Sequence, residues 1–109
     1  MTPYMQVITT VADKAHADQL AAHLLEQRLA ACVQIAPCDS VYRWQGKIEQ
    51  SEEMVCTLKS RRDLFPELCR VIRAHHPYQV PEILASPVVA GAESYLDWMN
   101  KELLPPKSE

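Results

Sequence analysis

The spacing of apolar residues predicts that strands and helices alternate along the chain. Residues 5–11 are rich in β-branched side chains, which favours a first strand. Asp13 can cap a following helix, whose apolar residues recur on one face. Residues 29–36 have strand character in their second half, whereas Leu29-Ala30-Ala31 could equally extend the helix. Pro37 and Asp39 should break this run.

A long hairpin is expected in the middle of the chain. Residues 41–44 predict a strand with Tyr42 and Trp44 on one face. A tight turn follows, because Gly46 accepts a positive φ without a steric penalty, and residues 48–59 return as the partner strand. The two aromatic rings either pack on the core of their own chain or are buried by another subunit. The second is favoured, because the hairpin is long for so small a domain.

The second half of the chain predicts helix, strand and helix. Asp63 can cap a helix that should end near His75, since a proline follows two residues later. Residues 83–89 form an apolar run of strand length, and residues 92–103 have the pattern of a third helix. Residues 104–109 are expected to be a frayed tail.

This order of elements predicts an α+β fold of the ferredoxin-like βαββαβ type. Such a fold has an antiparallel sheet with both main helices on one face, and here it carries a long β-hairpin and an extra C-terminal helix. The 109 residues suffice for one domain, residues 1–109. The fold serves many functions, so it does not decide this one.

Composition excludes several classes of partner. The net charge of -3 and the lack of a basic run argue against nucleic acid. No apolar run is long enough to span a membrane, and the first residues given lack the basic and apolar regions of a signal peptide, so a cytoplasmic protein is expected. The four cysteines have no zinc-finger spacing, and we expect them to be free thiols, with Cys38 the most exposed.

The segment His75-His76-Pro77-Tyr78-Gln79-Val80-Pro81-Glu82 is the main candidate for chemistry. Its prolines predict a stiff loop between the second helix and the last strand. In one interpretation the histidines only cap the helix and Glu82 is solvated. In the other, an imidazole and Glu82 converge on a metal ion or a polar ligand.

Several segments together resemble the CutA divalent-cation tolerance family. They are residues 29–32 (LAAC), 42–49 (YRWQGKIE), 64–66 (LFP), 75–82 (HHPYQVPE) and 95–98 (YLDW). The resemblance extends from about Val7 to Leu103, and the aromatic turn followed by the His-His-Pro-Tyr loop is its most specific part. It implies a homotrimer of ferredoxin-like subunits joined by the long hairpin, and hence a trimer interface for Tyr42 and Trp44.

The resemblance also implies tolerance of divalent metals, with copper bound by a cysteine, a histidine and a glutamate. The matching residues are His75 and Glu82, with His76 a weaker candidate, whereas Thr9 stands in place of the family cysteine. Threonine is a poor copper ligand compared with a thiolate, so the site is incomplete and binding should be weak.

The expected function is therefore that of a non-enzymatic, trimeric, copper-type metal-binding protein. The alternative is a signalling trimer that senses a small molecule in clefts between subunits, although the chain has no glycine-rich phosphate loop. No nucleophile–base pair and no organic cofactor can be assigned from the residues.

Overall fold

The computed structural model describes residues 2–76 and 78–106, which form a mixed α+β fold. The elements are β1 (Tyr4–Val11), α1 (Lys14–Glu26), β2 (Cys32–Trp44), β3 (Lys47–Arg61), a short 3-10 helix (Arg62–Leu64), α2 (Phe65–Ala74), β4 (Leu84–Pro87) and α3 (Glu93–Glu102). The four strands lie in the order β2-β3-β1-β4, and each neighbouring pair is antiparallel. The predicted α+β class and antiparallel sheet are confirmed. Within the described ranges, no helix has the length and apolar character needed to cross a membrane.

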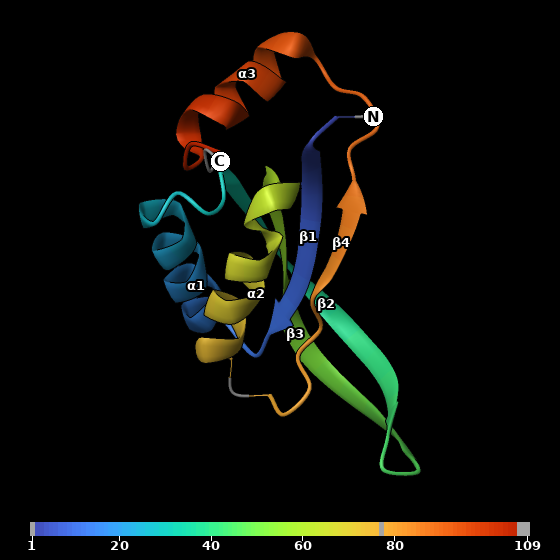
Figure 1. The fold of residues 1–109 in the computed structure, drawn as a ribbon. Coiled ribbons are helices and arrows are strands. Elements are labelled where there is room, and N and C mark those ends of the chain that lie inside the picture. Colours follow the sequence, from blue (N-terminus) through green and yellow to red (C-terminus); the bar gives the residue numbers. More distant parts are fainter. Residues whose placement is uncertain (1, 77, 107–109) are drawn as a thin grey trace.

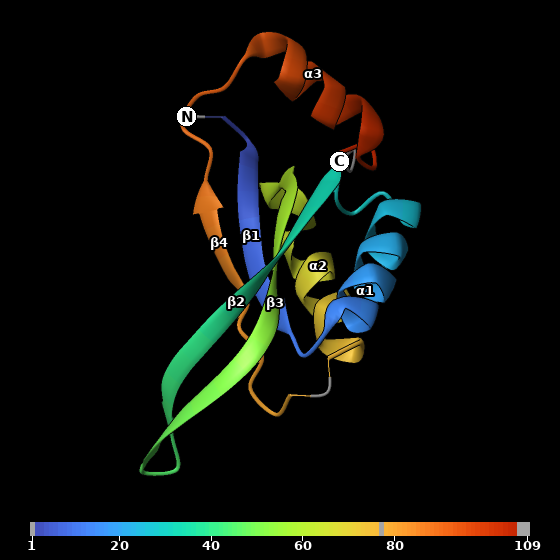
Figure 2. The ribbon, with the colours of Figure 1, turned by 180° about the vertical axis from the view of Figure 1, so that it is seen from behind.

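The two longer helices cover one face of the sheet. Figures 1 and 2 show α1 and α2 against that face and α3 across the end of the sheet. Alternate residues of β1 and β3 point toward the helices and are fully buried, among them Val7, Cys56 and Leu58. They pack with Leu24 of α1 and Ile72 of α2 in a single apolar core. The other residues of each strand face the side of the sheet that α1 and α2 do not cover.

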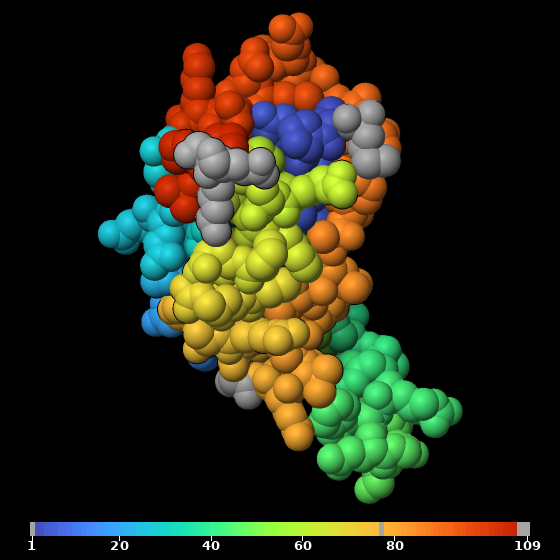
Figure 3. Space-filling model, in the orientation of Figure 1, coloured from blue at the N-terminus to red at the C-terminus, as the bar shows by residue number. Residues whose placement is uncertain are grey.

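The β2–β3 hairpin extends well beyond this core. Its ladder runs from the pair Cys32↔Lys59 to the pair Trp44↔Lys47. Gln45 and Gly46 both have positive φ, 50° and 79°, a combination that suits the twist of a two-residue hairpin turn. The hairpin tip projects from the body of the molecule (Figures 1 and 3), whose extents are 46 × 25 × 25 Å. The predicted hairpin is therefore confirmed.

Pro37 and Asp39 do not break the strand, contrary to the sequence-based expectation. Both lie inside β2, where Pro37 is opposite Met54 and Asp39 opposite Glu52. β2 is an edge strand with β3 as its only neighbour in the described sheet. A proline is tolerated there because its missing N–H can face away from the ladder.

The first helix ends just before Arg28, whose backbone adopts the left-handed conformation. Arg28 has φ 60°, its N–H donates to the carbonyl of Leu25, and the N–H of Leu29 donates to that of Leu24. This is the Schellman pattern, which ends a helix. Ala31 then donates to the carbonyl of Lys59, so the chain passes directly into the ladder with β3. Leu29-Ala30-Ala31 therefore does not extend the helix.

The two predicted helix caps differ in outcome. Asp13 is confirmed, because its Oδ1 accepts from the N–H of His16 at 2.9 Å. Asp63 is wrong as a cap: Leu64 occupies the N-cap position of α2 without a side-chain hydrogen bond, and Asp63 instead pairs with Arg61. The arginine is 4% exposed and offers a stronger, charge-assisted partner than a helix terminus.

The last elements are shorter than their patterns predict. The expected strand at residues 83–89 is reduced to β4, and α3 ends at Glu102. Of the expected tail, residues 107–109 lie outside the described residues. Both backbone hydrogen-bonding groups of Leu104 are engaged: its N–H donates to the carbonyl of Arg28, and its carbonyl accepts from the guanidinium of Arg61 at 2.6 Å. The ordered chain therefore continues beyond α3.

Candidate functional site

His75 lies at the C-terminal end of α2 with one ring nitrogen already committed. Its Nδ1 is 3.0 Å from the carbonyl oxygen of Val71. A carbonyl only accepts, so Nδ1 carries the proton and Nε2 keeps a lone pair for a ligand. The ring lies against that of His23 of α1, with centroids 4.4 Å apart and the planes tilted by 43°. This arrangement fixes the orientation of the imidazole in the way that metal-binding histidines require.

His76 fixes the loop to the sheet instead. Its Nε2 lies 2.5 Å from the carbonyl oxygen of Thr10 in β1, and its Nδ1 accepts from the N–H of Tyr78 at 3.3 Å. The ring also lies against that of Tyr78, at 4.5 Å between centroids. Both ring nitrogens are thus engaged within the protein, so in this conformation neither is free to bind a metal.

Thr9 is fully buried on the helix side of β1. It is 0% exposed and lies opposite Cys56 in the ladder with β3. Its hydroxyl has no hydrogen-bond partner among the described residues. The position that the resemblance assigns to a cysteine ligand therefore belongs, in this chain, to the apolar core.

Glu82 lines a cavity on the other side of the sheet, the side without α1 and α2. The cavity has a volume of about 560 Å³ and is bordered by residues of β1, the hairpin and the loop before β4. Its lining residues are Thr10, Ser40, Val41, Tyr42, Trp44, Glu53, Tyr78, Gln79, Val80 and Glu82. His75 is not among them. Within the described ranges, no three His, Cys, Asp or Glu side chains are grouped closely enough to hold a metal ion.

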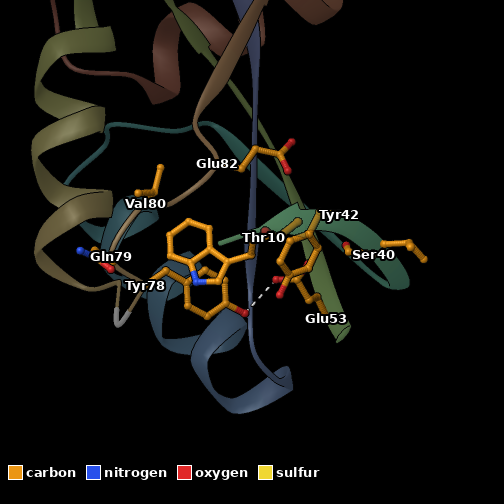
Figure 4. Close-up of a pocket in the computed structure, with 10 residues that line it drawn as sticks. Thr10, Ser40, Tyr42, Glu53, Tyr78, Gln79, Val80 and Glu82 are labelled. Carbon is orange, nitrogen blue, oxygen red and sulfur yellow. Dashed lines mark hydrogen bonds between the residues drawn. The ribbon is translucent and has the colours of Figure 1, made fainter. Parts of the chain in front are cut away.

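Glu53 and Tyr78 are joined by a hydrogen bond in the wall of this cavity. Glu53 is only 8% exposed, and its Oε2 accepts from the hydroxyl of Tyr78 at 2.8 Å, as the dashed line in Figure 4 shows. The pKa of the Tyr78 hydroxyl is raised, first because burial disfavours the phenolate and then because Glu53 accepts its proton in a hydrogen bond and adds negative charge. Tyr78 therefore remains a hydrogen-bond donor throughout the physiological pH range.

Sequence reasoning placed Glu82, Tyr42 and Trp44 in functional roles but missed Glu53 and Tyr78. The strand pattern of the sequence held part of the information needed to find Glu53. Glu53 lies opposite Cys38 in the ladder, and alternation along β2 puts Ser40, Tyr42 and Trp44 on that same face. The register was not known beforehand, and Tyr78 lies 25 residues further along the chain.

The aromatic residues of the hairpin do not pack in the core of this chain. Tyr42 is 43% and Trp44 39% exposed. The Tyr42 hydroxyl bonds with Ser51 on the neighbouring strand at 2.9 Å. Of the two interpretations given above for these rings, packing in the core of their own chain is excluded.

Known proteins of one family match this chain over nearly its whole length. The profile of the CutA1 divalent ion tolerance protein family matches residues 5–102. A divalent-cation tolerance protein CutA from Yersinia pestis is 46% identical over 99 residues, which cover 90% of this chain and 83% of that protein.

Solved structures agree with the sequence match. The divalent cation tolerance protein Cut A1 from Thermus thermophilus superposes with a TM-score of 0.89 at 40% identity and covers 92% of this chain and 98% of its own. CutA1 from Oryza sativa gives 0.93 at 35% identity, with 96% and 97% covered.

Proposed function

Because this chain belongs to the CutA1 divalent ion tolerance protein family, we propose that it binds divalent metal ions, copper in particular, without enzymatic activity. Its working form is a homotrimer of ferredoxin-like subunits in the cytoplasm. The observation that carries the proposal is the family match over residues 5–102. A small-molecule-sensing trimer is the second candidate, favoured by the cavity of about 560 Å³ beside the hairpin.

The proposed metal ligands are His75 and Glu82. The contact between the Nδ1 of His75 and the Val71 carbonyl leaves Nε2 as the ligand atom. Imidazole nitrogen and carboxylate oxygen suit copper(II), and copper(II) should bind more tightly than zinc at such a site. The described residues supply no third ligand, because Thr9 is buried and His76 is engaged. Water or a neighbouring subunit completes the coordination, so the affinity should be low.

Copper calorimetry on the assembled protein tests this assignment. His75→Ala and Glu82→Ala should each lose the binding heat of the parent. His16→Ala is the matched control, since His16 is exposed and paired with Asp13 at the start of α1, so its removal should leave copper binding intact. Binding should weaken in mild acid, because protons compete for the ligand nitrogen.

Two outcomes would contradict parts of this proposal. If both alanine variants bind copper as the parent does, the metal site is elsewhere and the role of the His75 loop is wrong. If neither the parent protein nor any variant binds copper, the small-molecule alternative becomes the stronger candidate.

A further inference from the structure

We propose that His23, in the last turn of α1, is a positioning residue for His75. Its ring holds the His75 imidazole in the orientation that leaves Nε2 open to a metal ion. This inference rests on the proposed function and deepens it, since it concerns how the ligand atom is held in place. Sequence reasoning gave no role to His23, because no local pattern relates the end of α1 to the end of α2.

The arrangement of the two helices brings these rings together. Figures 1 and 2 show that α1 and α2 lie side by side and run in opposite directions. Side chains on a helix lean toward its N-terminus, so a residue in the last turn of α1 and a residue at the end of α2 lean toward each other. The result is the contact between His23 and His75, with ring centroids 4.4 Å apart.

The hydrogen bond to Val71 does not fix the His75 ring by itself. His75 is exposed at the C-cap position of α2. The Val71 carbonyl that accepts from Nδ1 at 3.0 Å also accepts from the backbone N–H of His75 at 3.2 Å, so the ring shares this acceptor. A ring held at one atom can still turn about that atom. A flat neighbour against its face removes this freedom, and His23 is such a neighbour.

His23 is suited to positioning rather than to binding the metal itself. Its Nε2 lies 3.0 Å from the side-chain amide nitrogen of Gln27, four residues further along the chain. An amide nitrogen only donates, so the lone pair of this ring nitrogen is already used, and the proton of the neutral ring is on Nδ1. The same bond holds the half-buried His23 ring in place. His23 therefore acts on the metal only through His75.

The contact between the two rings lies within one chain. α1 and α2 cover one face of the sheet, whereas the proposed trimer forms through the hairpin (Figures 1 and 2). The positioning of His75 therefore does not depend on which surfaces a neighbouring subunit covers.

The first test is copper calorimetry on the assembled protein. His23→Ala removes the ring and should weaken copper binding by at least about tenfold, as is usual when a group that orients a metal ligand is lost. His23→Phe restores a flat ring without nitrogen and should bind copper nearly as tightly as the parent does. His16→Ala, at the other end of α1, is the matched control and should leave the affinity unchanged, since exposed His16 is paired with Asp13.

The second test needs no metal. NMR of the ring nitrogens in mildly alkaline buffer, where imidazoles are neutral, reports which nitrogen of His75 carries the proton. The parent and His23→Phe should show the Nδ1–H form that the contact with Val71 requires. In His23→Ala the His75 ring should exchange between its two tautomers, because it is free to turn away from the Val71 carbonyl.

Either of two results would overturn the inference. The first is a folded His23→Ala protein that keeps the parent's copper affinity or the parent's His75 tautomer. The second is a His23→Phe protein that binds copper as weakly as His23→Ala, which would mean that a nitrogen of His23 contacts the metal directly.

Two further cases keep the inference testable. If His23→Ala does not fold, as its circular dichroism melt would show, His23→Gln replaces it, because glutamine removes the ring and suits a helix. A parent protein that binds no copper would refute the proposed function alone, and the tautomer comparison would still decide whether His23 positions His75.

Discussion

At the scale of single residues, Thr9 brings a hydroxyl into the core without a hydrogen bond to any residue that the structure describes. The side chain is fully buried and its Oγ1 has no partner among the described residues. An unsatisfied buried hydroxyl destabilises a fold by about 1–3 kcal/mol. Thr9→Val has nearly the same shape and should therefore raise the free energy of unfolding by about 1 kcal/mol, as measured by urea denaturation.

Ser60→Ala is the contrasting variant for this prediction. Ser60 is also fully buried, but its hydroxyl donates to the carbonyl of Leu29 at 2.6 Å. Its removal should lower the free energy of unfolding by about 1–2 kcal/mol, because the Leu29 carbonyl loses its donor. If Thr9→Val proved as destabilising as Ser60→Ala, the Thr9 hydroxyl would have a partner after all.

The raised pKa of Tyr78 predicts that the folded protein loses stability in alkali. Because its pKa is raised in the folded protein, the folded chain holds the phenolic proton more tightly than the unfolded chain does. The stability supplied in this way is complete below the unfolded tyrosine pKa of about 10 and declines as the pH rises above it. Denaturation measured across this range should show a shallower decline in Tyr78→Phe than in the parent. Identical slopes would mean that burial and Glu53 do not disfavour the phenolate.

At the scale of elements, Arg28 links the ends of two helices. It adopts the left-handed conformation that ends α1, which is unfavourable for a residue with a side chain. Its Nε donates to the carbonyl of Glu102 at 2.9 Å, its Nη2 to that of Lys101, and its own carbonyl accepts from Leu104. Figure 1 shows the loop after α1 beside the end of α3, where these bonds form. The guanidinium thus caps α3 while the backbone of the same residue ends α1.

Two substitutions at Arg28 separate these roles. Arg28→Ala keeps the left-handed strain and loses the cap, so it should lower the free energy of unfolding by about 1–2 kcal/mol. Arg28→Gly loses the same cap but adopts positive φ freely, so it should be more stable than Arg28→Ala by about 1 kcal/mol. Thermal melts of the two proteins check the order. A glycine variant no better than the alanine variant would show that the backbone there is not strained.

At the scale of the whole molecule, several large apolar side chains on the hairpin and in or just after β4 are exposed and do not pack in the core. Val41, Ile48, Leu84 and Val89 are 63–71% exposed, in addition to the half-exposed Tyr42 and Trp44. Exposed apolar side chains on an extended hairpin often mark an interface with another chain. This exposure supports the proposed homotrimer, in which neighbouring subunits cover the hairpin.

Sedimentation at sub-micromolar protein should therefore show three chains together. Trp44→Ala should weaken assembly by about 2–4 kcal/mol if the indole anchors the interface. Trp98→Ala is a suitable control, since Trp98 is similarly exposed, at 41%, and belongs to α3, which lies at the end of the molecule away from the hairpin tip (Figure 1). A folded monomer of the parent chain would contradict the proposal.

The sequence by itself determined the features that depend on neighbouring residues. The cap at Asp13, the end of α2 at His75 and the turn at Gly46 are each set by a side chain or a φ angle within a few residues. The apolar periodicity likewise predicted which segments are strands and helices. For these features the deciding steric and hydrogen-bonding terms act within a single turn or strand.

Only the tertiary structure decided the features that depend on strand order and register. Pro37 remains inside β2 because β2 is an edge strand, and Asp63 turns to the buried Arg61 rather than to a helix end. Glu53 and Tyr78 meet across 25 residues, because the hairpin register and the loop after α2 bring them to the same side of the sheet. Local pattern gives each residue a face of its own strand, but which side chain it meets there depends on how the strands are aligned with one another.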